Sequence, residues 1–354
     1  MPSPVKKLRL SALLTNRKKR LSKDVVVVLI IVLPIILFLL SLPLGRYQIT
    51  TIDVVRILLS PIFPDIADGI PLIAQQLVLQ VRVPRILAAL LIGASYGATG
   101  TAFQAIFKNP LVDSNILGVT SGAGFGAAIA ILLMAGTWQV QISAFVFGLL
   151  AVSLSFFGSR LYKATPLLVL TLMGILVGSL FNSLTSLLKY VADPLDALPA
   201  ITFWLLGSLT NVTWNRMSAL IIITLFGLVL LWLVRWRLNI LSLGDQEAKS
   251  LGVDPVQVKI LIIFIATLMT AVAVSISGVI GWVGLVIPHA GRMIVGPDHK
   301  RLMPVSIGLG GAFMILIDNV SRTLLPGEIP LGVLTGLIGV PMLIILLRRS
   351  KTGW

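Results

Sequence analysis

The stretch VVVVLIIVLPIILFLLSLPL, residues 25–44, decides the fold class of this chain. It runs for 20 positions without a charged residue. About 20 apolar residues form a helix long enough to cross the hydrocarbon core of a membrane. We therefore predict that residues 25–44 form a membrane-spanning helix.

The rest of the chain has the same character. Of its 354 residues, 57% are hydrophobic and only 12% are charged, about half the charged fraction of a soluble domain. Lipid leaves an open chain no way to satisfy its backbone except by forming helices. We therefore predict an all-α, polytopic membrane protein with about ten transmembrane helices. The nine further spans lie at approximately 86–107, 115–135, 140–160, 166–188, 214–234, 257–277, 280–295, 304–324 and 331–347.

The positive charges are distributed unevenly along the chain, which carries a net charge of +15. With ten spans and the N-terminal tail inside, 21 of the 28 Lys and Arg residues fall on the inner side and 7 on the outer side. Cytoplasmic loops carry this kind of excess, whereas a nucleic-acid groove would need a clustered basic face. We predict that both termini are cytoplasmic. The domains are a basic tail at 1–24, one transmembrane domain at 25–349 and a short C-terminus at 350–354.

Motifs for catalysis, metal binding and nucleotide binding are missing from the sequence. It has no cysteine and two histidines, too few for a convincing metal site, and it lacks the phosphate-binding G-x-x-x-x-G-K-[ST] pattern. Gly122, Gly124 and Ala127 match G-x-G-x-x-A, but they lie inside a predicted span, where a dinucleotide site does not form. We predict a chain that is not an enzyme and binds neither metal nor cofactor. Small residues should instead allow close helix contact, among them Gly93, Gly97, Gly100, Gly308 and Gly311.

The loop between the sixth and seventh predicted spans, residues 243–252, reads LGDQEAKSLG and predicts a short helix. Asp245 can cap its N-terminus, Lys249 lies in its last turn, and Gly252 can adopt the left-handed conformation that follows a helix. Asp254-Pro255 then offers a cap and a first-turn proline for the next span. Two interpretations follow: a solvated connector, or an element that docks on a cytoplasmic partner.

Eight separated motifs, taken in order, resemble the permease subunits of iron-siderophore, haem and vitamin B12 ABC importers (FecCD-type). The resemblance covers roughly residues 25–349. The motifs are RVPR at 82–85, FKNPLV at 107–112, ILGV at 116–119, WLLGSL at 204–209, LGDQEAKSLG at 243–252, GWVGL at 281–285 with PH at 288–289, GPDH at 296–299, and PLG at 330–332 with GVP at 339–341.

The resemblance implies a type II ABC importer permease in a bacterial or archaeal cytoplasmic (inner) membrane. Its partners would be a second permease subunit, two cytoplasmic ATPase subunits that use ATP and Mg, and a periplasmic or lipid-anchored binding protein. An iron-siderophore is the first substrate candidate, with haem, cobalamin and molybdate also open. The alternative is an ion-coupled secondary transporter. The resemblance also makes residues 243–252 the coupling helix to the ATPase, with Leu243, Gly244, Asp245, Glu247, Ala248, Leu251 and Gly252 as its functional residues.

Three arginines, Arg82, Arg85 and Arg322, are expected on the outer side, where cations are few. One interpretation makes them anchors at the level of the lipid headgroups. The resemblance implies instead that they dock the binding protein, and the planar arginine fork suits a carboxylate. Asp318 lies one turn before Arg322 on the same helix face, so we predict a structural ion pair for this intramembrane acid rather than a proton relay.

The resemblance also places an inner gate near the ends of the second and fourth spans. By motif, Asn109 and Leu111 become gate candidates, and by approximate position so does Thr165. Asn109-Pro110 is in any case a turn signal.

Overall fold

The computed structural model describes residues 24–161 and 166–349, and every regular element among them is helical. Seven helices are long and apolar enough to cross a membrane. The first of them is Asp24–Ser41, and the second runs without a break over Leu72–Phe107. The others are α6 (Thr137–Ser159), α7 (Pro166–Val191), α9 (Trp214–Leu243), α11 (Pro255–Ser277) and α13 (His299–Thr323).

The remaining three predicted spans are also helices, but shorter ones. They are α5 (Val119–Leu132), α12 (Val283–Val295) and α14 (Leu331–Arg349). Since α5 and α12 have only 14 and 13 residues, neither reaches the length that crosses a bilayer alone. Irregular backbone completes them inside the protein, where it finds partners. For example, the carbonyl of Ser277, before the irregular segment that leads into α12, accepts the backbone N–H of Ser208 at 2.8 Å. All ten predicted spans thus correspond to a helix.

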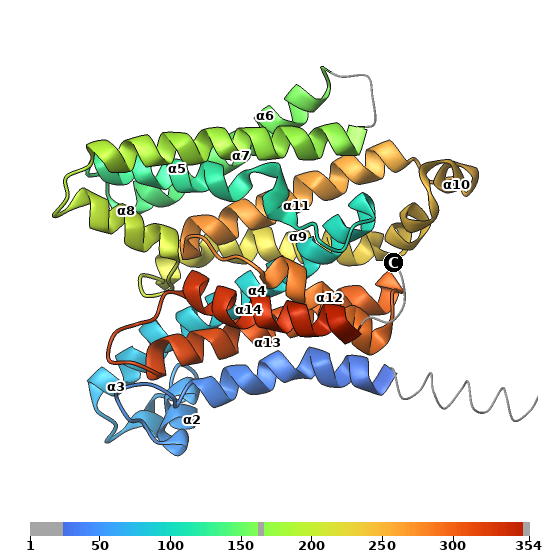
Figure 1. The fold of residues 1–354 in the computed structure, drawn as a ribbon. Helices are drawn as coiled ribbons and strands as arrows, with labels where there is room; N and C mark the ends of the chain where they lie inside the picture. Colours follow the sequence, from blue (N-terminus) through green and yellow to red (C-terminus); the bar gives the residue numbers. More distant parts are fainter. Residues whose placement is uncertain (1–23, 162–165, 350–354) are drawn as a thin grey trace, which may run out of the picture.

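The helices run between two ends of the molecule that differ in structure (Figure 1). The α10 end holds α10 (Asp245–Ser250), the start of the first helix and the end of α14. The α2 end holds short elements: α2 (Thr51–Leu59), a 3-10 turn at Pro64–Ala67, α3 (Leu72–Gln76) and α8 (Ala197–Leu206). Of these, α8 is apolar but has only 10 residues, too few to cross a membrane. Its Ile201 is buried and its Phe203 is exposed.

The buried centre of the bundle is α4 (Val83–Phe107), which a π-helical segment at Leu77–Arg82 joins to α3. A methyl group added at Gly93 would overlap the carbonyl oxygen of Gly310 in α13, and one at Gly97 would overlap that of Ser306. The backbones of α4 and α13 therefore touch, as predicted for small residues in spans. Gly308, which the sequence placed in the same group, packs instead against Ile30 of the first helix.

Candidate functional site

The short helix α10 projects from the bundle at the α10 end (Figure 1). Ala248, in the middle of this helix, is fully buried and packs the helix against the rest of the protein. A complete left-handed cap ends it: Gly252 has φ +77°, its N–H donates to Lys249 O at 3.0 Å, and Val253 N–H donates to Ala248 O at 2.9 Å. The predicted cap at Gly252 is confirmed, and so is the cap at Asp254, which accepts from the N–H groups of Val256 and Gln257.

The start of α10 differs from the prediction. Asp245 is the first helical residue, Gly244 occupies the N-cap position, and no side chain caps the helix there. The Asp245 carboxylate instead accepts two hydrogen bonds of 2.7 Å from Nζ of Lys259 in α11. Lys259, 14 residues later, therefore binds the carboxylate that the sequence predicted as the helix cap. The ion pair ties α10 to α11 across the turn.

The outer surface of α10 combines charge with exposed apolar side chains. Leu243 and Leu251, at its two ends, are 64% and 59% exposed. Glu247 lies exposed between them and folds back over Gly244, where a side chain would collide with its carboxylate. Gly244 also has φ +156°, so a glycine fits that position best. Of the seven predicted coupling residues, Gly244 and Ala248 face inward and the other five face solvent.

At the α2 end, two of the predicted docking arginines are buried against the end of the first helix. Arg82 donates to the carbonyls of Leu42, Pro43 and Tyr47 at 2.5–3.0 Å. Arg322 donates to the carbonyls of Ser41 and Leu44 at 2.8 Å. Helix C-termini leave unpaired carbonyls and a partial negative charge. The two guanidinium groups bind these carbonyls and neutralise the partial negative charge. They thereby fix the end of the first helix against α4 and α13.

The third arginine, Arg85, bridges two carboxylates from distant parts of the chain. Its Nε donates to Asp318 at 2.9 Å, and its two terminal nitrogens donate to Glu328 at 2.7 and 3.0 Å. Asp318 also lies 3.5 Å from Nε of Arg322. Glu328 is partly exposed and accepts from Thr210 at 2.6 Å. Burial raises the pKa of the Glu328 carboxyl, but the hydrogen bonds from Arg85 and Thr210 outweigh it and hold that pKa below its ordinary value.

These contacts correct the expectation that Arg82, Arg85 and Arg322 are surface groups. Their exposed fractions are 4%, 7% and 7%, and each guanidinium already makes three hydrogen bonds. A carboxylate from a docking protein would have to break these bonds. The predicted structural ion pair of Asp318 with Arg322 is confirmed, and Arg85 is a second, closer partner that sequence spacing did not reveal.

The predicted gate residues lie at the α10 end of α4. Lys108 ends the helix with φ +51°, and Oδ1 of Asn109 then accepts the N–H of Leu111 at 2.9 Å. Leu111 is 57% exposed. Asn109 therefore forms the turn that the Asn109-Pro110 pair predicts, and Leu111 remains accessible. Thr165 lies outside the described residues.

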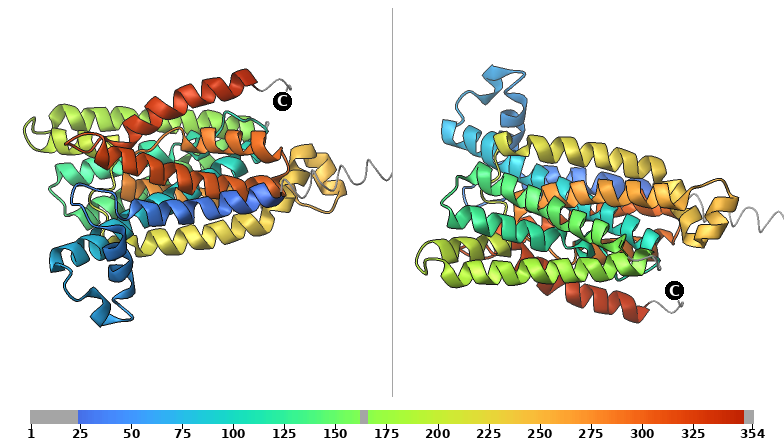
Figure 2. Two further views of the ribbon diagram at one scale, coloured as in Figure 1. Left: turned by 90° about the horizontal axis from the view of Figure 1, so that it is seen from below. Right: turned by 90° about the horizontal axis from the view of Figure 1, so that it is seen from above.

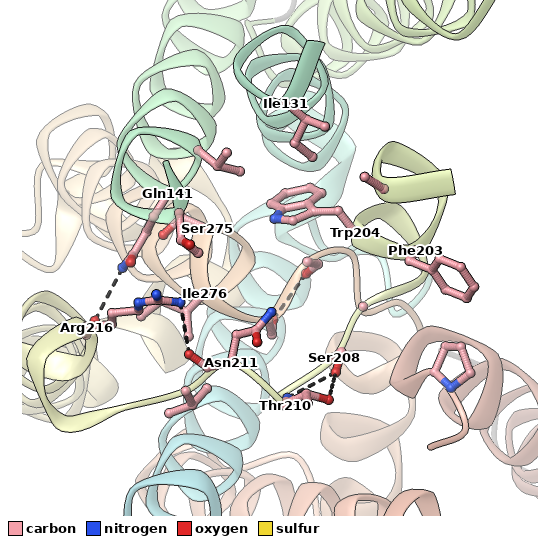
Figure 3. A pocket seen from close by; sticks show the side chains of 18 of the residues that line it. Ile131, Gln141, Phe203, Trp204, Ser208, Thr210, Asn211, Arg216, Ser275 and Ile276 are labelled. Atoms are coloured by element: carbon pink, nitrogen blue, oxygen red, sulfur yellow. Dashed lines mark hydrogen bonds between the residues drawn. The ribbon is translucent and has the colours of Figure 1, made fainter. Parts of the chain in front are cut away.

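A cavity of about 610 Å³ opens at the α2 end, and Figure 3 shows its lining. Trp204 and Phe203 of α8 form an apolar wall, and polar groups face it from other elements. Gln141 of α6 donates to the carbonyl of Arg216 at 3.3 Å, and Arg216 donates to the carbonyl of Asn211 at 3.1 Å. Glu328 also lines the cavity, so the cavity adjoins the arginine cluster.

Comparison with known proteins places this geometry in a family. The model of the FecCD transport family matches residues 32–349. The molybdate import system permease protein of Haemophilus influenzae is 40% identical over 319 residues, which cover 90% of this chain and 94% of that protein. This chain belongs to the FecCD transport family.

Two further relatives of this permease support the same family assignment. The cobalamin import system permease protein of Halobacterium salinarum is 39% identical over 284 residues, covering 80% of this chain and 76% of that protein. A solved metal-chelate type ABC transporter, in an inward-facing conformation, superposes with a TM-score of 0.82 at 38% identity, covering 92% of this chain and 99% of that one. The chain is therefore a multi-pass transport subunit of the ABC permease kind.

Sequence reasoning missed two features of this permease. One is the pair of carboxylates that holds Arg85, because its partners are 233 and 243 residues away. The other is the cavity, whose lining comes from four separated segments, 131–141, 200–216, 275–278 and 328–330. The WLLGSL motif at 204–209 was the one signal that pointed there, since it supplies Trp204, Gly207 and Ser208.

Proposed function

We propose that this permease pairs with a second permease subunit to form the transmembrane path of a binding-protein-dependent importer for a metal chelate. Two ATPase subunits that bind ATP and Mg would dock at the α10 end, which we assign to the cytoplasm. A substrate-binding protein would dock at the α2 end. The assignment is supported by the excess of cations in the segments at the α10 end.

The observation that carries this proposal is the structure of α10. A helix held by one buried alanine, a left-handed cap and an ion pair to α11 is rigidly fixed to the bundle. It nevertheless exposes Leu243 and Leu251 on either side of acidic residues. Exposed apolar side chains rimmed by polar residues mark surfaces that a partner can cover.

The test is charge reversal on α10, Asp245→Lys with Glu247→Lys, in the reconstituted importer. We expect uptake to fall tenfold or more, because two like-charge contacts at an interface cost several kcal/mol. The double variant Asp65→Lys with Asp68→Lys makes the same charge change at the α2 end and is the matched control for ATPase association, which only the α10 variant should weaken. Lys259→Gln separates loss of the internal ion pair from loss of docking. Unchanged ATP-driven uptake in the α10 variant contradicts the proposal.

The proposed power source is tested in the same vesicles. Uptake should require the ATPase subunits and persist when a protonophore collapses the proton gradient. The contacts of Asp318 support this, since both of its partners are arginines and a relay would need a group that exchanges protons. Uptake that follows the gradient would instead support an ion-coupled secondary transporter.

Two substrate classes follow from the relatives. Iron-siderophores, haem and cobalamin are metal chelates, whereas molybdate is a small oxyanion. The identity of 40% over nearly the whole molybdate permease supports the oxyanion as the second candidate. Titrating the cognate binding protein with a ferric siderophore and with molybdate distinguishes them, because the bound form is the one delivered to the path.

The proposed second permease subunit would cover α7 and α14. Both helices expose leucines on the same side of the molecule, with Leu176 and Leu180 of α7 62% and 54% exposed and Leu337 of α14 68% exposed. Cross-linking of cysteines introduced at these positions tests the contact. Cross-links between two copies of this chain would indicate a homodimer.

A further inference from the structure

The helix α9 presents a continuous apolar stripe that ends in aromatic and basic residues. Seven side chains on this face are 43–67% exposed and recur at the three- and four-residue spacing of one helix face. They are Ile222, Leu225, Phe226, Val229, Trp232, Leu233 and Trp236. Figure 2 shows α9 on the side of the molecule opposite α7 and α14. The stripe therefore stays open to lipid when α7 and α14 are covered by a second subunit.

At the α10 end of the stripe, two arginines stack on the two tryptophans. The guanidinium carbon of Arg235 lies 3.9 Å from the ring centroid of Trp232, and that of Arg237 lies 5.5 Å from the ring of Trp236. Tryptophan concentrates at the headgroup level of a membrane, and stacked arginine is weakly hydrated there. The stripe thus ends at the depth where lipid phosphates lie.

Neither of these arginines has an acidic partner in the described part of the chain. Arg235 and Arg237 belong to none of its ion pairs, and the Nε of Arg235 is enclosed without a hydrogen-bond partner. Arg235 donates from one terminal nitrogen to the carbonyl of Trp232, whereas Arg85 and Arg322 each face a carboxylate. Two unpaired cations with a free donor at the headgroup level are suited to an anionic oxygen ligand.

The start of α13 adds a third cation beside them. Asn239, one turn after Arg235, donates to Asp298 at 2.6 Å and accepts the backbone N–H of His299 at 2.8 Å. These bonds bring Lys300 next to the arginine-bearing turn of α9. The Asp298 carboxylate is occupied by Asn239 and by the backbone N–H of Lys300. Asp298 keeps its negative charge, but Arg235, Arg237 and Lys300 outnumber it, so the local charge is positive.

We propose that Trp232, Arg235, Trp236 and Arg237, with Lys300, form a binding site for the headgroup of an anionic phospholipid. The phosphate accepts from the guanidinium donors, the tryptophan rings cover the glycerol region, and the acyl chains lie along the apolar stripe of α9. A soluble phosphate has no use for the stripe, so the ligand is a lipid. None of these residues lines the cavity, and the site does not depend on which substrate is carried.

The test is lipid retention by the purified full-length permease, measured by native mass spectrometry after exchange into phosphatidylcholine containing a minor fraction of phosphatidylglycerol. We expect the wild type to retain phosphatidylglycerol preferentially. Arg235→Gln with Arg237→Gln should reduce this preference about 25-fold, because each cation near a headgroup contributes about fivefold. Arg160→Gln is the matched control, since Arg160 also stacks on an aromatic ring, that of Phe156 at 4.7 Å, but lies at the end of α6 and not on α9.

A second measurement needs no variant. Phosphatidylglycerol carrying a photoreactive headgroup should cross-link the wild-type protein within residues 232–237. Cross-links confined to other segments, equal retention of the two lipids, or an equal loss in the Arg160 variant would each overturn the proposal. Displacement of the retained lipid by inorganic phosphate would show that the site recognises the free anion, and would overturn the assignment to lipid.

Discussion

Replacing Asp318 by asparagine tests whether the buried charges at the α2 end hold the fold. Asp318 is 1% exposed and faces Arg85 at 2.9 Å and Arg322 at 3.5 Å. At an effective dielectric constant of about 20, each contact is worth about 5 kcal/mol before desolvation. Removing one partner of a buried pair costs about 3–5 kcal/mol, because a buried charge is left uncompensated. Asparagine keeps one acceptor for Arg85, so we expect a loss of about 3 kcal/mol in the free energy of unfolding.

The assay is equilibrium unfolding of the detergent-solubilised permease by sodium dodecyl sulfate. Asp318→Asn is combined with Arg85→Gln in a double-mutant cycle, for which we expect a coupling energy of about 2 kcal/mol. Asp65→Asn, an exposed carboxylate at the same end, is the control and should shift the free energy by less than about 0.5 kcal/mol. A similarly small shift for Asp318→Asn, together with weaker capture of the binding protein, would refute the structural role and support docking.

Three further perturbations have defined outcomes. Glu328 has a pKa below its ordinary 4.5, so its carboxylate stabilises the fold above that pH and loses this contribution as the pH falls through the folded-state pKa. The unfolding free energies of wild type and Glu328→Gln should differ by about 1 kcal/mol at pH 7, and the difference should shrink as the pH is lowered through the acidic range. Gly93→Ala should cost about 3 kcal/mol or abolish insertion, because its methyl overlaps the backbone of Gly310, whereas Gly281→Ala, with open space around it, should express normally. Gly252→Ala should lower the unfolding free energy by about 1 kcal/mol, since φ is +77° and no atom opposes the methyl; an unchanged value would mean that the turn readjusts.

Hydropathy predicted the spans well because lipid imposes one solution on the backbone of an open chain. It did not predict where they end. The first apolar run continues to Leu44, yet the helix stops at Ser41. There the carbonyls of residues 41–44 accept hydrogen bonds from Arg82 and Arg322. Pro43 is a local signal for this helix end, because the residue before a proline disfavours the helical conformation. The two arginines that bind these carbonyls lie 40 and 281 residues away and leave no such signal.

In the short helix α10, too, one end was predictable from the sequence and the other was not. Its C-terminal cap was predictable, because the geometry needs one glycine at one position. Its N-terminus was not, because Asp245 could equally cap the helix or pair with a cation, and the neighbouring helix supplied Lys259. Local backbone chemistry is therefore readable from sequence, whereas the choice between two polar partners depends on packing.

The outer arginines show why position along a span does not separate docking residues from structural ones. Both roles favour arginine near a span end, so Arg82, Arg85 and Arg322 fit either interpretation until their donors are accounted for. Each of the three already makes three hydrogen bonds inside the protein. Arg46, on the same end, is exposed and donates a single bond of 3.3 Å to the carbonyl of Leu325. An approaching acidic surface can recruit Arg46 without breaking the fold, so electrostatic steering at the α2 end should depend on such peripheral cations, while the motif arginines keep the receiving surface in shape.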